Sequence, residues 1–139
     1  MFKSNERAER KQKIKRWLQS ALYLRQEVDL KHKMLDELTM VENSVNEIGD
    51  NAVVSKHLCE LRNSLLKDVS SLLVLKNRIK CAVDKLEDPR LRIIYEAKYI
   101  NNQTWEEIAE LMFFSVIHVR RLAESGYSLL ADSIFSEAT

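Results

Sequence analysis

The chain has 139 residues, of which 45% are hydrophobic and 31% charged, and its formal net charge is +1. This size suits one compact domain, or a small domain that carries an elongated helical arm. Because only two glycines and one proline interrupt the chain, long helices are expected and a β architecture with many turns is excluded. We therefore predict an all-α fold.

Two long segments carry apolar residues at the three-four spacing of amphipathic helices. The first runs from Ile14 to Ile48 and is interrupted by Lys31 and Glu42, and the second runs from Val54 to Leu86 and is interrupted by Asp68. Three turn-forming residues, 49–51, separate them. Two helices of about 35 residues joined by a short turn predict an antiparallel helical hairpin.

The apolar stripe of this hairpin is wider than a two-helix contact requires. Either the C-terminal helices or a second copy of the chain must cover the excess, and we expect self-association, as a homodimer or larger homo-oligomer, through this region. The extra apolar positions are Leu18, Leu22, Leu30, Met34, Val41, Leu66, Val69 and Leu73.

Neither a disulfide nor a membrane segment is expected. Cys59 and Cys81 lie on one predicted helix, roughly 33 Å apart, which is beyond the reach of a disulfide. They are predicted to be free thiols. The N-terminal segment lacks the apolar run and cleavage site of a signal peptide, and nothing approaches the ~18 apolar residues of a membrane span. We expect a cytoplasmic protein without membrane contact.

A second domain is predicted to begin at Asp88, so that residues 1–87 form the basic N-terminal segment and hairpin, and residues 88–139 the second domain. Asp88 suits an N-cap and Pro89 the first helical position, which predicts a helix from Pro89 to about Ile100. After the polar break at 101–103, Thr104 and Glu107 have the spacing of a capping box. The next helix is therefore expected to start at Trp105.

The segment from Thr104 to Leu122 has the spacing of a helix-turn-helix. A short helix with Ile108, Ala109 and Met112 facing inward is followed by a tight turn at Phe113 and Phe114. Ser115 is then expected to cap a second helix. Its buried face, together with Phe114, would complete the core of a three-helix domain: Val119, Leu122, Leu129 and Leu130.

The stretch T-W-E-E-I-A-E-L-M-F-F-S-V-I-H-V-R-R-L, which begins at Thr104, resembles region 4 of the bacterial sigma-70 factors. Together with Glu87 to Ile100, it is similar to a family of small phage and prophage late transcription regulators typified by RinA and ArpU. The specific motifs cover residues 88–130, whereas residues 12–87 are similar in helical layout. The resemblance implies a DNA-binding transcriptional regulator that acts with RNA polymerase in a bacterial host cell.

The same resemblance implies that Ser115 begins the recognition helix. Double-stranded DNA would then be contacted by Ser115, Val116, Ile117, His118, Arg120 and Arg121. A guanidinium can bind guanine bidentately or pair with phosphate, although Arg120 is also spaced to pair with Glu124. Val116 and Ile117 depart from the family's polar pattern, and an apolar group can contact only a thymine methyl or another hydrophobic surface.

Phe113 also departs from the family, because it occupies the turn position where glycine is usual. Either the turn avoids the left-handed conformation, or Phe113 carries strain of roughly 1–2 kcal/mol. Trp105, at the start of the first helix of the motif, is expected to pack in the core or against the hairpin rather than stack on bases.

Charge is uneven along the chain. Residues 1–16 hold seven basic and two acidic side chains, for a net +5, whereas residues 88–139 hold five and eight, for a net −3. Since phosphate attraction dominates nucleic-acid affinity, the acidic domain is expected to need the N-terminal basic run. The alternative is that this basic run is only the solvated start of a helix. The run consists of Arg7 and five candidate phosphate contacts: Arg10, Lys11, Lys13, Lys15 and Arg16.

The sequence contains no glycine-rich phosphate loop, nucleophile elbow or H-E-x-x-H spacing, and its histidines have no metal-ligand spacing. We expect no enzymatic activity, no cofactor and no metal. The leading hypothesis is a DNA-binding transcriptional regulator. The alternative is a protein-interaction adaptor or antagonist that keeps the fold and presents Val116 and Ile117 to a protein.

Overall fold

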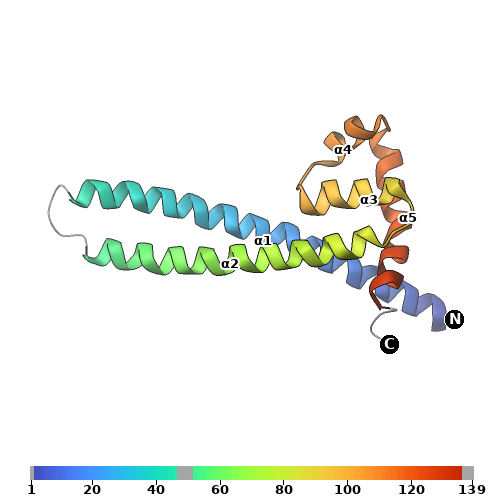
Figure 1. Cartoon of the computed structure of the whole chain (residues 1–139), viewed down its shortest axis with the longest axis horizontal. Coiled ribbons are helices and arrows are strands. Elements are labelled where there is room, and N and C mark those ends of the chain that lie inside the picture. The colour runs from blue at the N-terminus through green and yellow to red at the C-terminus, as the bar shows by residue number, and fades with distance from the viewer. Residues whose placement is uncertain (1, 47–51, 136–139) are drawn as a thin grey trace. The chain divides into compact units, whose positions relative to one another are not determined.

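A computed structural model describes residues 2–46 and 52–135, and no strand occurs within these ranges. The all-α prediction is confirmed. Figure 1 shows the elements in chain order: α1 (Phe2–Asn46), α2 (Ala52–Asp84), α3 (Pro89–Tyr95), the π-helix η1 (Glu96–Ile100), α4 (Trp105–Met112) and α5 (Val116–Phe135).

The chain divides into two compact units, and each is described here by itself. One contains the residues up to Leu22 and those from Leu75 onward, and the other is Tyr23–Val74. This division differs from the predicted boundary between residues 87 and 88, because the start of α1 and the end of α2 pack with the C-terminal helices. The N-terminal basic segment therefore belongs to the same unit as the predicted helix-turn-helix.

Helix α1 begins at Phe2 and not at Ile14, so the basic run is helical. The sequence contains the reason, since Glu6 and Glu9 each precede a basic residue, Arg10 and Lys13, by four positions, a spacing that supports a helix. The predicted turn at 49–51 and the end of the first pattern at 47–48 lie outside the described residues.

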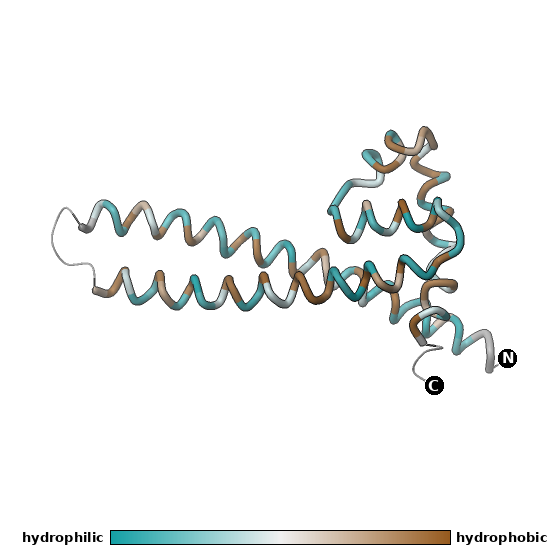
Figure 2. Tube along the Cα trace, in the orientation of Figure 1, coloured by the Kyte–Doolittle hydropathy of each residue, from teal (hydrophilic) through white to brown (hydrophobic). Residues whose placement is uncertain are grey.

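The unit Tyr23–Val74 is a pair of antiparallel helical segments (Figure 1). Leu58, Leu65 and Leu72 of α2 are buried in it, and Figure 2 shows hydrophobic residues recurring along both segments. Two of the three residues that interrupt the apolar pattern, Lys31 and Asp68, form an ion pair with each other. Lys31 Nζ also donates a hydrogen bond to Ser64 Oγ at 2.8 Å. The charges of Lys31 and Asp68 are thus paired with each other.

The wide apolar stripe is covered at some of its positions and exposed at others. Leu18 is buried and Leu22 half-buried in the unit that contains the C-terminal helices, while Val69 is half-buried in the hairpin. The other predicted extra positions are exposed in this chain: Leu30, Met34, Val41, Leu66 and Leu73. These five side chains are thus still uncovered.

The core of the other unit contains residues of all six helical elements in the described ranges. Ile14 and Leu18 of α1 and Ile79 and Val83 of α2 are buried with the C-terminal helices. The inward positions predicted there are confirmed in large part, because Ile108, Ala109, Val119 and Leu130 are buried and Met112, Phe114 and Leu122 pack against them. Leu129 was predicted to be buried and is 56% exposed, since α5 turns it away from this core. The three-helix core therefore extends into α1 and α2.

The predicted helix starts of the C-terminal region are confirmed by their caps. Asp88 accepts a hydrogen bond from the amide of Arg90 at 2.9 Å, and Pro89 is the first residue of α3. Thr104 and Glu107 form the capping box, with the amide of Glu107 donating to Thr104 Oγ1 at 3.1 Å and the amide of Thr104 to Glu107 Oε1 at 3.4 Å. These caps fix where α3 and α4 begin.

Three further findings concern the whole described chain. Cys59 and Cys81 are both free. In the part of the chain that the structure describes, no helix is long and apolar enough to cross a membrane. Residues 2–46 and 52–135 contain no group of three His, Cys, Asp or Glu side chains that could hold a metal ion.

Candidate nucleic-acid interface

Buried tyrosines dock α5 onto α3 and η1. The hydroxyl of Tyr95 donates to the carbonyl of Ala123 at 2.7 Å, and the hydroxyls of Tyr99 and Tyr127 form a hydrogen bond of 2.7 Å. Burial raises the pKa of Tyr95 and of Tyr99 well above the ordinary tyrosine value. The hydroxyls therefore stay protonated at neutral pH and keep these hydrogen bonds.

The turn between α4 and α5 adopts the left-handed conformation at Phe113, where φ is 59° and ψ is 36°. The amides of Phe113 and Phe114 donate to the carbonyls of Glu110, at 3.3 Å, and Ala109, at 3.0 Å, which is how a left-handed residue closes a helix end. Of the two alternatives for this turn, the strained one is observed. The Phe113 side chain is 95% exposed.

Ser115 caps α5 as predicted, because its Oγ accepts a hydrogen bond from the amide of His118 at 3.1 Å. Val116 follows and packs, half-buried, against the core. Ile117 is 70% exposed. His118 is half-buried and lies edge-on to the Phe114 ring, with 4.6 Å between ring centroids. Val116 and His118 thus have contacts within the protein, whereas Ile117 points outward.

Arg120 and Arg121 are both exposed. The Arg120 guanidinium carbon lies 5.8 Å from the centre of the Trp105 ring, and Lys98 Nζ lies 4.8 Å from the same ring. Trp105 is half-buried against the core, as expected. Partial burial lowers the pKa of Lys98. The tryptophan ring therefore links the core to two cationic side chains, through the cation–π attraction.

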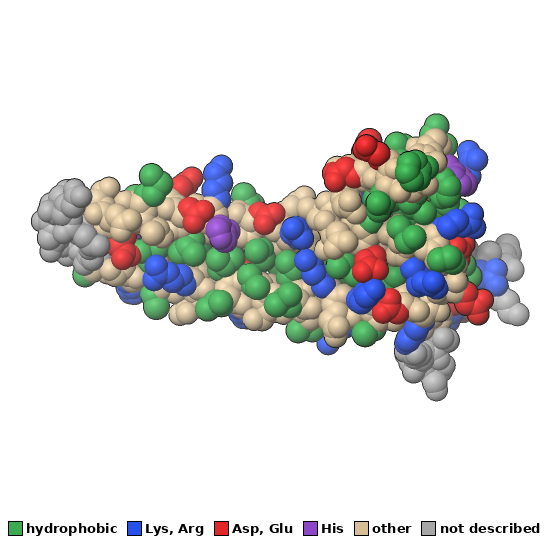
Figure 3. Space-filling view, turned by 45° about the horizontal axis from the view of Figure 1, so that its top comes forward, with side chains coloured by type: hydrophobic (Ala, Val, Ile, Leu, Met, Phe, Trp, Pro, Cys, Tyr) green, Lys and Arg blue, Asp and Glu red, His purple; other side chains and the backbone are tan. Residues whose placement is uncertain are grey.

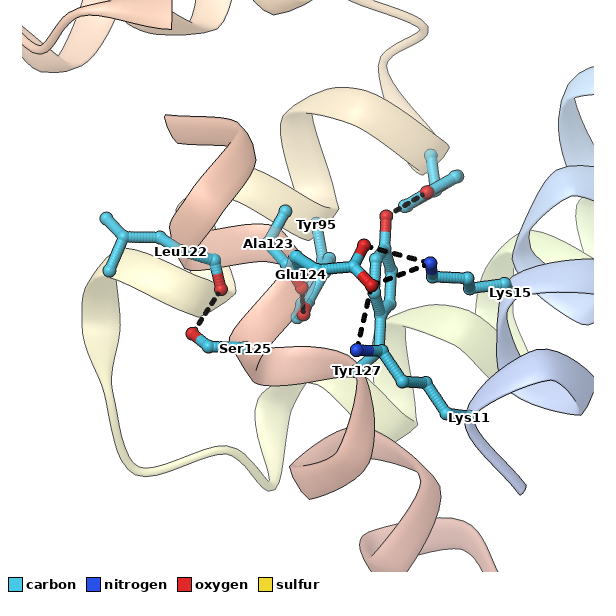
Figure 4. Close-up of polar contacts among 9 residues, drawn as sticks. Lys11, Lys15, Tyr95, Leu122, Ala123, Glu124, Ser125 and Tyr127 are labelled. Atoms are coloured by element: carbon cyan, nitrogen blue, oxygen red, sulfur yellow. Dashed lines mark hydrogen bonds and ion pairs between the residues drawn. The ribbon is translucent and has the colours of Figure 1, made fainter. Parts of the chain in front are cut away.

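Glu124 connects α5 to the basic start of α1 (Figure 4). Lys11 Nζ lies 2.8 Å from Glu124 Oε1, and Lys15 Nζ lies 2.8 Å from Oε2. The two ammonium groups hold the pKa of Glu124 below its ordinary value. The sequence allowed a pair between Arg120 and Glu124, but the partners of Glu124 are the two lysines.

These side chains surround a groove of about 760 Å³ between α1, α4 and α5. Its lining contains four basic side chains and one acidic side chain, so the charge is positive although residues 88–139 are net acidic. Tyr99, Trp105 and Tyr127 supply apolar surface beneath the charges. The charged lining residues are Lys11, Lys15, Arg120, Arg121 and Glu124.

The other residues of the basic run lie elsewhere on α1. Arg7 and Arg10 line a shallow depression with Ser128 and Asp132 of α5, while Lys13 and Arg16 line another formed by α1 alone. Of the predicted basic run, Lys11 and Lys15 are therefore the two brought to the groove beside Arg120 and Arg121.

Sequence reasoning missed Glu124 as part of this groove and Lys98 as a cation at the Trp105 ring. A four-residue spacing places Lys11 and Lys15 on one face of α1, but their partner Glu124 is more than a hundred positions away (109 from Lys15). Comparison of the chain with protein-family models, curated proteins and solved structures finds no match.

Proposed function

We propose that the protein is a DNA-binding transcriptional regulator in which the first turns of α5 enter the major groove. The observation that carries the proposal is the link from Lys11 and Lys15 to Glu124. It brings cations of α1 to the same groove as Arg120 and Arg121. Two lysines of the basic segment and two arginines of α5 thus line one groove with a net positive charge.

The two arginines suit base and phosphate contacts. An exposed guanidinium can bind guanine O6 and N7 with two hydrogen bonds, or pair with a phosphate. The contact with the Trp105 ring restricts Arg120 before any ligand is bound, which reduces the entropy that binding costs. Lys11 and Lys15 add the sequence-independent attraction to phosphate that dominates affinity.

The motif resemblance supports a more specific role. The capping box at Thr104 and the cap at Ser115 lie in the stretch that resembles sigma region 4 and the phage late transcription regulators. We propose that the regulator is of this phage or prophage type and acts with bacterial RNA polymerase. No catalytic step, cofactor or metal is part of the proposal.

The test is binding of a fluorescein-labelled duplex, followed by anisotropy at low salt. Direct binding by the parent chain is expected, and Arg120→Ala/Arg121→Ala is expected to weaken it by at least tenfold, since each good base contact contributes about 1–3 kcal/mol of discrimination. The control Arg62→Ala/Arg78→Ala removes the same charge from exposed positions on α2. Equal affinity of the two double variants would show that the recognition helix is assigned wrongly.

A second candidate function is a protein adaptor or antagonist with the same fold. Phe113 and Ile117 favour it, because they are 95% and 70% exposed and offer apolar surface at the turn and first helical turn. Exposed apolar side chains commonly mark protein interfaces where they adjoin to form a patch. A parent chain that binds no duplex even at low salt would favour the adaptor over the DNA-binding regulator.

We also propose that the hairpin self-associates. On α1, Leu30, Met34 and Val41 are spaced by four and seven residues, which places these exposed side chains on one helix face. Leu66 and Leu73 are exposed on α2. Light scattering should give at least twice the 16.3 kDa chain mass, and Leu30→Gln/Met34→Gln should lower it. A parent chain that stays monomeric at high concentration would refute the association.

A further inference from the structure

Ile117 has an environment unlike that of the other apolar residues in the first two turns of α5. Val116 packs against the core and Val119 is fully buried, at 0% exposure. Ile117 is 70% exposed and contributes little to the core. Its side chain is therefore available to a ligand, although a single exposed isoleucine is not by itself a binding site.

The position of Ile117 on the helix adds a second observation. Arg120 and Arg121 follow it by three and four residues, and side chains at these spacings lie on one helix face. All three are exposed. Figure 3 shows hydrophobic side chains over α4 and α5 next to basic ones. An apolar contact and two guanidinium groups thus share one surface.

The rotation of α5 about its axis is fixed from both sides. Val119 is buried in the core, and the cap on Ser115 and the ring contact between Phe114 and His118 hold the first turn. Ile117 cannot turn inward without removing Val119 from the core. When α5 enters a groove through Arg120 and Arg121, Ile117 must enter with them.

The chemistry of the major groove identifies what an isoleucine can contact there. Base edges present hydrogen-bond donors and acceptors, and the apolar group among them is the C5-methyl of thymine. We propose that Ile117 determines sequence specificity by contacting a thymine methyl, next to the bases or phosphates that Arg120 and Arg121 contact. This inference rests on the proposed DNA-binding function.

The experiment removes the methyl group without changing base pairing. Selection from a random duplex pool with the full chain defines a bound sequence, and each thymine in it is then replaced in turn by deoxyuridine. One replacement should weaken parent binding by about three- to tenfold, the scale of one buried methyl contact. Ile117→Ala should bind the thymine and deoxyuridine duplexes equally.

The matched control is Leu129→Ala, which shortens another exposed apolar side chain of α5, 56% exposed and three turns further on. It should keep the parent's preference for thymine. Circular dichroism melting checks that both variants are folded, which their exposure leads us to expect.

The possible results distinguish failure of the thymine contact from failure of DNA binding. A parent chain that binds no duplex contradicts both. Binding that is the same for every deoxyuridine replacement, or that has no sequence preference, contradicts the thymine contact alone and leaves the exposed isoleucine to a protein partner. A preference for thymine that survives in Ile117→Ala assigns the methyl contact to another residue.

Discussion

Glu124 places a carboxylate where a DNA phosphate would meet the same two lysines. Its pKa is held low by Lys11 and Lys15, so it is ionised at neutral pH. The contribution of this bridge to stability is present above the ordinary carboxyl range and is lost as the pH falls through the lowered pKa. Because Glu124 is half-exposed, the bridge itself contributes at most about 1 kcal/mol.

Glu124→Gln should therefore strengthen DNA binding. It removes an anion that competes with phosphate for Lys11 and Lys15, and we expect the dissociation constant at low salt to fall about tenfold, given the weight of phosphate contacts. Glu110→Gln removes the same charge from an exposed site on α4. If both variants bind equally, net charge and not this competition is the cause.

Gly126 fixes how closely α5 approaches α3. A Cβ at this position would lie 2.4 Å from Tyr95 Oη and 2.8 Å from Leu91 Cδ2, both of buried residues. Gly126→Ala should lower the free energy of unfolding by about 1–3 kcal/mol, as overpacked cores do. Urea unfolding measures it, with Ser125→Ala on the exposed face as control. An unchanged midpoint would contradict the packing.

Residue-scale features were predictable from sequence only where the partners are close along the chain. The caps at Asp88, Thr104 and Ser115 depend on residues two or three positions apart, and all three form. The partners of Glu124 depend on tertiary packing. The four-residue spacing rule therefore favoured Arg120 as the partner of Glu124, whereas the tertiary fold places Lys11 and Lys15 beside this carboxylate.

At the scale of elements, helix identity was predictable and helix ends were less so. Apolar periodicity indicated α1 and α2, but it located the start of α1 at Ile14, because the preceding turns are charged and carry no apolar stripe. No sequence signal indicated the π-helix η1, whose amides bond one residue further back, as from Asn101 to the carbonyl of Glu96 at 3.0 Å.

The turn between α4 and α5 gives a prediction at this scale. Phe113 is left-handed and almost fully exposed, so glycine would relieve the strain while removing little packing. After the entropy that glycine costs, Phe113→Gly should raise the free energy of unfolding by about 0.5–1 kcal/mol.

The control for that turn is Leu111→Gly, an exposed site within α4, where glycine should lower the free energy of unfolding by about 1 kcal/mol. Urea unfolding compares the two variants directly. Changes of the same sign would contradict the left-handed turn.

For the molecule as a whole, the fold class was predictable from composition and the division into units was not. The sequence boundary at Asp88 marks a helix start, yet Ile14 and Val83 are buried in one core with Ile108 and Val119. Apolar spacing identifies which face of a helix is buried but does not identify what covers it. Because Ile14 is part of that core, the basic segment must be tested by substitution and not by deletion.

In the function that we propose, α1 and α5 bind DNA as one surface. The most direct test is the slope of log binding constant against log salt concentration, for the parent and for Lys11→Ala/Lys15→Ala. Each phosphate contact contributes about −0.9 to this slope. The control is Lys33→Ala/Lys67→Ala, which removes two exposed charges from the unit Tyr23–Val74. We predict that the slope becomes shallower by about one to two in Lys11→Ala/Lys15→Ala and stays unchanged in the control. A slope in Lys11→Ala/Lys15→Ala identical to the parent's would contradict binding through one surface.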